Sequence, residues 1–206
     1  MIQNLPVPRV GYAKSTSTRA QILAAALEEA GAAGLQNTSV AGIAKRANTA
    51  VGSLNYHFGS RQALLEQAMS QLIQDLYVRL ASVDAEPGLD FFDRYRAELL
   101  AYVGYVRENP THIRLADEIK FLAPDLYQKQ ITDWVGLIRT KLEQGIAEGA
   151  VRPLDDAQLT ATAYYLVGSR QFLEDMVAAG HRDEDLVDAF IELIRSGLAK
   201  PRRSGR

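Results

Sequence analysis

Apolar residues recur every three or four positions along nearly the whole chain, the spacing that places them on one face of an α-helix. No segment alternates apolar and polar residues for long enough to predict a strand. With 206 residues and 47% hydrophobic content, the chain can also bury a substantial core. The sequence therefore predicts an all-α fold of about nine helices.

Capping residues, glycines and prolines divide this periodic pattern into segments. The first helix is expected to open at Thr18, which has capping-box spacing to Gln21, and to end at Gly34. Further helices are expected over residues 38–47, 51–58, 61–83, 92–106, 110–123, 131–149, 156–173 and 183–198.

Charge is distributed unevenly along the chain. Residues up to Arg61 include six Lys and Arg against two Asp and Glu, whereas the remainder has 17 against 23. A basic N-terminal part joined to an acidic body favours contact between the N-terminal part and a polyanion, although chance clustering gives the same count.

Several classes of protein lack support in the sequence. There is no cysteine, no run of about eighteen apolar residues and no apolar block of a secretory signal, so a cytoplasmic protein without disulfides is expected. His57, His112 and His181 are scattered, and no catalytic or nucleotide-binding motif occurs. We therefore expect no enzyme activity, no cofactor, no metal and no membrane partner.

The segment 38–65 has the spacing of a helix-turn-helix. The expected helices 40–47 and 51–58 are joined by Asn48, Thr49 and Ala50, and asparagine tolerates the left-handed backbone that such a turn needs. The second helix has a thin apolar stripe, and small or hydrogen-bonding residues occupy the rest of its circumference. This surface suits a helix in the major groove of DNA. Its outward residues are Gly52, Ser53, Asn55, Tyr56 and His57.

The residues "TSVAGIAKRA" and "LNYHFGSRQALL" resemble the DNA-binding segment of the TetR/AcrR family of bacterial transcriptional regulators, and the likeness extends from Thr18 to Leu65. The resemblance implies phosphate contacts by Thr38 and Ser39 and groove contacts by Gly52 and Ser53. It also implies a clamp on the DNA backbone by Tyr56, His57 and Arg61. Asn48, Ala50, Val51 and Asn55 depart from the residues usual in the family, so the operator cannot be transferred from relatives. The candidate DNA-binding residues are Lys14, Arg19, Thr38, Ser39, Thr49, Val51, Gly52, Ser53, Asn55, Tyr56, His57 and Arg61.

Some of these residues also have a structural interpretation. The Tyr56 ring can pack in the core while its hydroxyl reaches a phosphate. His57 can cap a helix, Arg61 can be a solvated residue of a first turn, and Lys14 and Arg19 can be solvated. Phe58 is expected to fill the core.

The predicted organisation is a flexible arm (1–17), a helix-turn-helix domain (18–62), a helical ligand-binding and dimerisation domain (63–199) and a disordered basic tail (200–206). Family resemblance implies a dimer on a palindromic operator, released by an unidentified small molecule. The alternative is a DNA-bound architectural or protein-recruiting factor without a ligand pocket. The candidate pocket residues are Tyr102, Tyr105, Arg114, Glu118, Phe121, Trp134, Arg139 and Tyr165, and the candidate dimer residues are Leu166, Arg170, Leu173, Phe190, Leu193 and Ile194.

Overall fold

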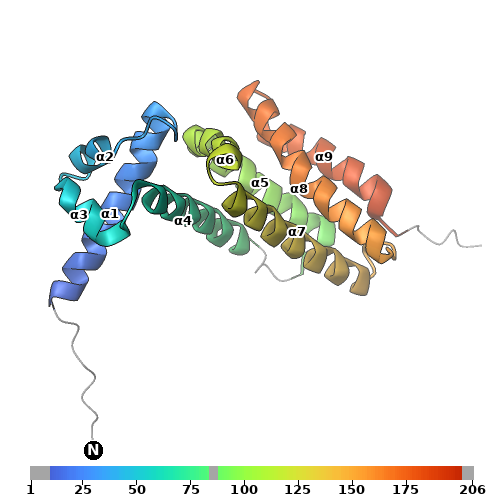
Figure 1. The fold of residues 1–206 in the computed structure, drawn as a ribbon. Coiled ribbons are helices and arrows are strands. Elements are labelled where there is room, and N and C mark those ends of the chain that lie inside the picture. Colours follow the sequence, from blue (N-terminus) through green and yellow to red (C-terminus); the bar gives the residue numbers. More distant parts are fainter. Residues whose placement is uncertain (1–9, 84–87, 201–206) are drawn as a thin grey trace, which may run out of the picture. The chain divides into compact units, whose positions relative to one another are not determined.

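The computed structural model describes residues 10–83 and 88–200, and these residues fold into nine α-helices, which confirms the predicted all-α class (Figure 1). Within the described residues, β-pairing is limited to one isolated antiparallel bridge between Val151 and Ala199. The helices are α1 (Val10–Ala33), α2 (Val40–Arg46), α3 (Val51–Phe58), α4 (Arg61–Ala81), α5 (Phe91–Glu108), α6 (Pro110–Leu122), α7 (Pro124–Ala147), α8 (Asp156–Ala178) and α9 (Asp183–Leu198).

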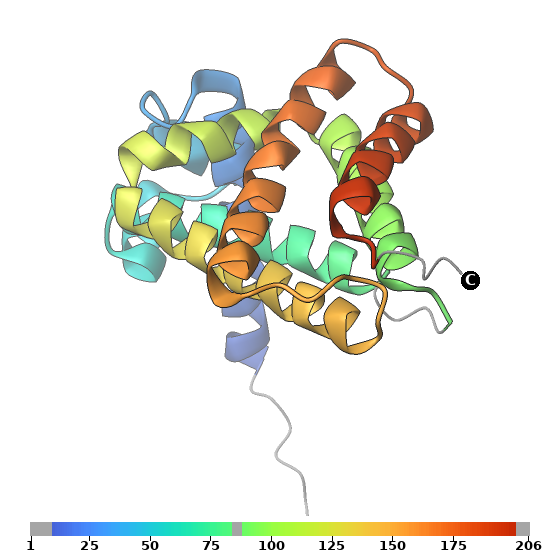
Figure 2. The ribbon, with the colours of Figure 1, turned by 90° about the vertical axis from the view of Figure 1, so that its right-hand side faces the viewer.

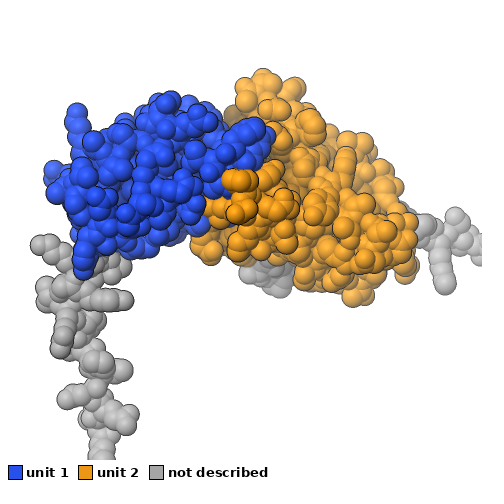
Figure 3. Space-filling model, in the orientation of Figure 1, with its two compact units in different colours: residues 1–73, 114–123 blue, residues 74–113, 124–206 orange. Residues whose placement is uncertain are grey.

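The chain forms two compact units, which Figure 3 colours separately. Unit 1 comprises Met1–Ile73 and Arg114–Ala123, and unit 2 comprises Gln74–Ile113 and Pro124–Arg206. The helices α4 and α6 each contribute residues to both units. None of the helices in the described part of the chain is both long and apolar enough to cross a membrane.

Unit 1 is organised around the apolar face of α1. Ile22 and Ala26 of α1 are fully buried and pack with Ile43 of α2, Leu54 of α3 and Leu64 of α4. The small residue Ala44 is also buried, as expected where two helices approach closely. This core fixes α2 and α3 against α1.

Unit 2 is a helical bundle in which α7 runs beside α8 and α5 beside α9 (Figure 2). Its core combines aromatic residues of α5 with aliphatic residues of α7, α8 and α9. The helix α8 begins with a capping box, in which Asp155 and Gln158 bond each other's backbone N–H groups. Both predicted ends of α9 are reproduced.

Several boundaries differ from the sequence-based expectation, including the start of α7 at Pro124 rather than at residue 131. The first helix begins at Val10 rather than Thr18, so part of the expected arm is helical. The backbone N–H of Lys200, in the expected tail, donates to Ala150 O at 3.1 Å. Unit 1 extends beyond the expected limit at residue 62, because Leu64 and Ala68 join its core. The expected arm residues 1–9 and tail residues 201–206 lie outside the described residues.

Candidate nucleic-acid interface

The helix α2 begins with a side-chain cap. Ser39 has an extended backbone, and its Oγ accepts a hydrogen bond from Gly42 N at 2.9 Å. This bond satisfies one of the free N–H groups at the start of the helix. Gly42 is required by close packing, since a Cβ there would collide with the carboxylate of Glu29. The exposed Ser39 therefore has a structural role in addition to its predicted phosphate contact.

The turn between α2 and α3 has the predicted left-handed residue. Asn48 has a φ of 48°, which asparagine adopts more readily than most residues. The N–H of Thr49 donates to Ala44 O at 3.0 Å, closing the end of α2. The angle between the two short helices therefore follows from the local sequence.

The helix α3 buries only two side chains, Leu54 and Phe58, which lie one turn apart. Its N-cap is Ala50, and no side chain caps the helix. Thr49 therefore does not replace the serine or threonine cap that the family resemblance implies at position 50. The conformation of α3 depends on its two buried contacts.

The outward face of α3 is open. A Cβ on Gly52 would meet no atom within 4 Å, and Asn55 is exposed. The side chain of Tyr56 is 85% exposed and Val51 is 43% exposed. These four residues form a narrow surface with little bulk at Gly52 and with hydrogen-bonding groups at Asn55 and Tyr56. We refer to Val51, Gly52, Asn55 and Tyr56 as the α3 face.

The ring of Tyr56 does not enter the core. It contacts the ring of His57 edge to face, with centroids 5.2 Å apart. His57 and Ser53 are half-buried at the margin of the α3 face. Phe58 is buried, as the sequence predicts. Of the two interpretations of Tyr56, the structure favours an exposed ring that can reach a ligand.

The structure corrects the prediction for the Thr38 side chain. Thr38 is only 2% exposed, and its hydroxyl donates to Gly34 O at 2.8 Å. The side chain therefore closes the end of α1 and is not available to a phosphate. Sequence spacing placed it correctly beside α2 but could not identify its acceptor.

Arg61 is also committed to the protein. Its Nε donates to Thr38 O at 2.6 Å, and its Nη2 donates to Leu35 O at 2.5 Å and Gln36 O at 3.0 Å. The guanidinium therefore ties the loop between α1 and α2 to the start of α4. This geometry gives Arg61 a structural role, and the predicted clamp on the DNA backbone stays a prediction.

Arg19 has partners on α3 and α4. Its guanidinium lies 4.7 Å from the centroid of the Phe58 ring and donates to His57 O at 3.2 Å and to Gln67. It therefore stabilises the end of α3 and remains exposed beside it. Thr49 is half-buried in the turn, and the side chain of Lys14 lies outside what the structure describes.

The predicted ligand-pocket residues do not form one cavity. Arg114, Glu118 and Phe121 belong to unit 1, where they line a shallow groove of about 310 Å³ with the end of α1. Glu118 accepts from Leu35 N at 2.6 Å and lies 3.6 Å from Arg114 Nε. Phe121 is 76% exposed.

The remaining candidates lie in unit 2 at separate places. Tyr102 and Tyr105 are buried, because successive inward positions of α5 fill the core instead of leaving a void. Trp134 stacks on Tyr77, with ring centroids 4.1 Å apart. Arg139 pairs at the surface with Asp156 at 2.7 Å, and Tyr165 is exposed on α8.

Most predicted dimer residues are internal. Leu166, Leu173 and Ile194 are buried within unit 2, and Arg170 is buried and paired with Glu98. Phe190 is half-buried against the core, whereas Leu193 is 70% exposed. The exposed apolar surface on α8 and α9 instead consists of Tyr164, Tyr165, Phe172, Met176 and Leu193.

Sequence analysis missed the ion cluster inside unit 2. Glu98 is 1% exposed and binds both Arg170 Nη2 at 2.7 Å and Lys141 Nζ at 2.5 Å. The available signal was its position between Tyr95 and Leu99 on the apolar face of α5. Among the described residues, no group of His, Asp and Glu is arranged to hold a metal ion.

Burial changes the titration of several groups in unit 2. It raises the pKa of Tyr77 to about 12, with a further contribution from the charge of Asp133. Burial also raises the pKa of Tyr95 and Tyr105 to about 12. For Arg170, burial opposes the charged form, yet Tyr95 and Glu98 hold the guanidinium pKa above its usual value.

Comparisons with known proteins extend these observations. Residues 22–68 match the family model described as "Bacterial regulatory proteins, tetR family". The HTH-type transcriptional regulator BetI of Burkholderia thailandensis is 36% identical over 85 residues, which cover 41% of this chain and 42% of that protein. BetI of Burkholderia cenocepacia is 37% identical over 71 residues, covering 34% and 36%. The chain thus matches less than half the length of these relatives.

Solved structures match over most of the chain. A TetR-family regulator from Rhodococcus sp. has a TM-score of 0.73 and 21% identity, covering 88% of this chain and 98% of that one. A TetR-family regulator from Agrobacterium tumefaciens has a TM-score of 0.69 and 20% identity, covering 90% and 100%. At this identity the likeness establishes the fold.

A helix-turn-helix with an open α3 face, followed by a helical unit, is the arrangement of an all-helical DNA-binding protein. The matched N-terminal segment and the matched solved structures both point to the same family of transcriptional regulators. The N-terminal segment of the chain is similar to the DNA-binding segment of the TetR family, and its fold is that of solved TetR-family regulators.

Proposed function

We propose that the protein is a cytoplasmic transcriptional repressor that binds a palindromic DNA operator as a homodimer and is released by a small molecule bound in unit 2. The observation that carries the proposal is the open α3 face. Only Leu54 and Phe58 are committed to the core, so the rest of the helix is available to a partner.

The α3 face has the properties that a major groove selects. An α-helix fits the groove only where its side chains are small enough, and Gly52 leaves that space. Asn55 can pair with an adenine edge, and Val51 can contact a thymine methyl. Tyr56 and Ser39, which are both exposed, would contact phosphates, and such contacts position a protein without reading sequence. Arg61 is not among the proposed contacts, because its Nε and Nη2 groups donate to carbonyls within unit 1.

A homodimer is supported by the exposed apolar residues of α8 and α9. Contiguous exposed apolar surface is typical of interfaces between subunits. Two copies would then present two α3 faces to half-sites about one helical turn apart, or a multiple of it. Tyr165, Phe172 and Leu193 would be covered in such a dimer.

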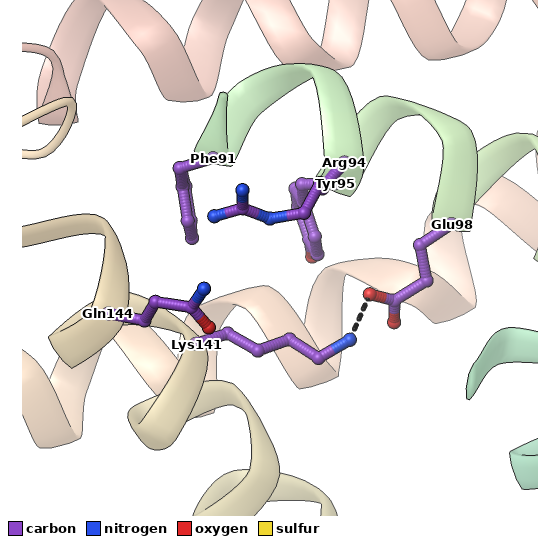
Figure 4. Close-up of a pocket in the computed structure, with 6 residues that line it drawn as sticks. All are labelled: Phe91, Arg94, Tyr95, Glu98, Lys141 and Gln144. Carbon is purple, nitrogen blue, oxygen red and sulfur yellow. Dashed lines mark hydrogen bonds and ion pairs between the residues drawn. The ribbon is translucent and has the colours of Figure 1, made fainter. Parts of the chain in front are cut away.

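Release by a small molecule is supported by cavities within unit 2. One, of about 120 Å³, lies between α5 and α7 (Figure 4), and an open groove of about 440 Å³ lies between the end of α4 and α7. Such space favours a ligand-responsive repressor over an architectural factor with a fully packed body.

The test begins with selection of bound fragments from genomic DNA, followed by titration of the selected DNA. Gly52→Leu is expected to weaken binding about 100-fold or more by blocking the groove. Gly136→Leu is the matched control, because Gly136 is also an exposed helical glycine whose Cβ would meet no atom within 4 Å. Both variants should keep wild-type helicity by circular dichroism. Equal DNA affinity of Gly52→Leu and wild type would contradict the proposal.

A further inference from the structure

Most cationic side chains that the structure describes in unit 1 are bonded within the protein. Five of them make an ion pair, a hydrogen bond or a ring contact with another residue. These are Arg19, Arg46, Arg61, Arg114 and Lys120. A cation held in this way must give up its protein contacts before it can bind a phosphate, and that loss offsets part of the binding free energy.

Lys45 differs from these five side chains. It is exposed, and no other described residue makes an ion pair or a hydrogen bond with its side chain. Its own helix, α2, contains no acidic residue. The sequence pattern does not distinguish Lys45 from its neighbour Arg46, whereas the structure does, because Arg46 is paired with Glu29.

The sides of α2 have different surroundings. Gly42 and Arg46 face Glu29 of α1, since a Cβ on Gly42 would collide with that carboxylate and Arg46 pairs with it at 2.5 Å. Ala41 and Lys45 are exposed and lie one turn apart on another side of the helix. This free side of α2 therefore consists of a small residue and an unpaired cation.

The position of Lys45 suits contact with a DNA backbone. A long side chain on a helix leans towards the N-terminus of that helix, so the stem of Lys45 extends towards Ala41, whose methyl group leaves the space open. In a helix-turn-helix, the first helix crosses the DNA backbone while the second helix lies in the major groove. When the α3 face enters the groove, the free side of α2 is therefore where a phosphate is expected.

We propose that Lys45 binds a phosphate of the DNA backbone and contributes a salt-dependent contact of the helix-turn-helix. This contact rests on the proposed function, because it forms only when the α3 face binds DNA. A lysine in the last turn of a helix also stabilises the helix dipole. That role alone would change the stability of the protein and leave the salt dependence of DNA binding unchanged.

The two roles can be separated because a phosphate contact releases counterions. Each neutralised phosphate adds about 0.9 to the slope of log affinity against log salt concentration. A homodimer carries two copies of Lys45, so loss of its charge should reduce the slope by about two. Since phosphates carry no sequence information, the loss of affinity should be the same on every duplex.

The experiment is a fluorescence-anisotropy titration of the full chain with two duplexes of equal length at several salt concentrations. One duplex is selected from genomic DNA, and the other has a random sequence. Lys45→Met keeps the stem and removes the charge, and it is expected to weaken binding to both duplexes by the same factor, about 10-fold or more. Lys45→Arg should keep the slope of the wild type. Lys120→Met removes the same charge from an exposed position of unit 1 on α6 and should also leave the slope unchanged.

Lys45 is exposed, so Lys45→Met should keep the helicity and the melting temperature of the wild type. A slope equal to that of the wild type, or unequal losses on the two duplexes, would overturn the proposal. Gly52→Leu tests the proposed function separately. If Gly52→Leu weakens binding while Lys45→Met keeps the slope, only the Lys45 contact is removed. A wild-type chain that binds neither duplex would remove the proposed function as well.

Discussion

At the scale of single residues, the two arginines beside α3 show how hydrogen-bond acceptors within the protein compete with DNA phosphates for a cationic side chain. Arg61 is bonded to three carbonyls of one loop, and Arg19 covers the Phe58 ring and bonds His57 O. Each carbonyl bonded in this way lies where the chain leaves a regular helix. The main role of these two arginines is therefore to stabilise the domain. Their positive charge also contributes a long-range field that attracts DNA.

Replacing Arg61 with alanine is expected to lower the free energy of unfolding by about 2–3 kcal/mol, since hydrogen bonds from a charged donor are lost. The salt dependence of DNA binding should keep its slope, whereas loss of a phosphate contact would reduce the slope by about one. Urea unfolding and salt titration of binding measure the two effects. Arg46→Ala, which removes a surface pair with Glu29, should change stability by less than about 1 kcal/mol.

The buried Tyr95 makes stability depend on pH at the alkaline end. Its folded-state pKa of about 12 lies above the unfolded value, so the unfolded chain loses its proton first. The contribution is fully present below pH of about 10 and is lost as the pH rises to about 12, amounting to about 3 kcal/mol for two pKa units. Unfolding free energies measured between these pH values should fall less steeply in Tyr95→Phe. Parallel curves for the two proteins would contradict the assignment.

At the scale of helices, the sequence predicted those helix limits that depend on capping residues and apolar spacing. The limits of α3 were predicted because Leu54 and Phe58 face inward and Asn48 fits the turn. The start of α1 was missed, because residues 10–17 include a polar run without apolar periodicity. The limits of α9 followed from its acidic first turn and its apolar face.

The candidate site was only partly predictable, because helical spacing identifies outward residues but not tertiary hydrogen-bond partners. Residues of the α3 face follow from helical spacing, so Gly52, Asn55 and Tyr56 were assigned correctly to the outward surface. The acceptors of Thr38 and Arg61 are loop carbonyls, whose positions depend on tertiary packing. Periodicity also cannot distinguish an aromatic side chain that lines a cavity from one that fills it, which is why Tyr102 was misplaced.

Capping makes opposite predictions for the two short helices. Ser39→Ala should lower the free energy of unfolding by about 1 kcal/mol, because Gly42 N loses its acceptor. Ala50→Ser should raise it by about 0.5–1 kcal/mol, because α3 has no side-chain cap. Urea unfolding compares the variants, with Ala20→Ser in the exposed middle of α1 as control, where serine is slightly unfavourable. Destabilisation by Ala50→Ser equal to that of the control would contradict the capping argument.

At the scale of the whole molecule, the proposed homodimer would use surface that each folded chain leaves exposed. Buried leucines of α8 and α9 stabilise the single chain, and the exposed residues Phe172 and Leu193 remain for a second copy. Because one set of apolar residues stabilises the chain and the other is left for the proposed interface, an apolar helix face by itself could not identify that interface. The two roles occupy adjacent positions on the same helices.

The double variant Phe172→Glu and Leu193→Glu is expected to be a folded monomer, since both side chains are exposed and the new charges would oppose each other across a dimer. Sedimentation velocity measures the mass, and DNA titration should show weaker binding. Phe121→Glu replaces an equally exposed aromatic residue in unit 1 and should remain dimeric. A dimeric double variant would exclude this surface as the interface.

The exposure of Tyr56 has a practical consequence for measuring the assembly. The chain contains no cysteine, so Tyr56→Cys would carry the sole thiol and accept one nitroxide label per protomer. Pulsed electron resonance would then give the separation of the labels in solution, for comparison with the ~34 Å repeat of the duplex. Titrating the selected DNA into the labelled protein would report whether bound DNA alters that separation.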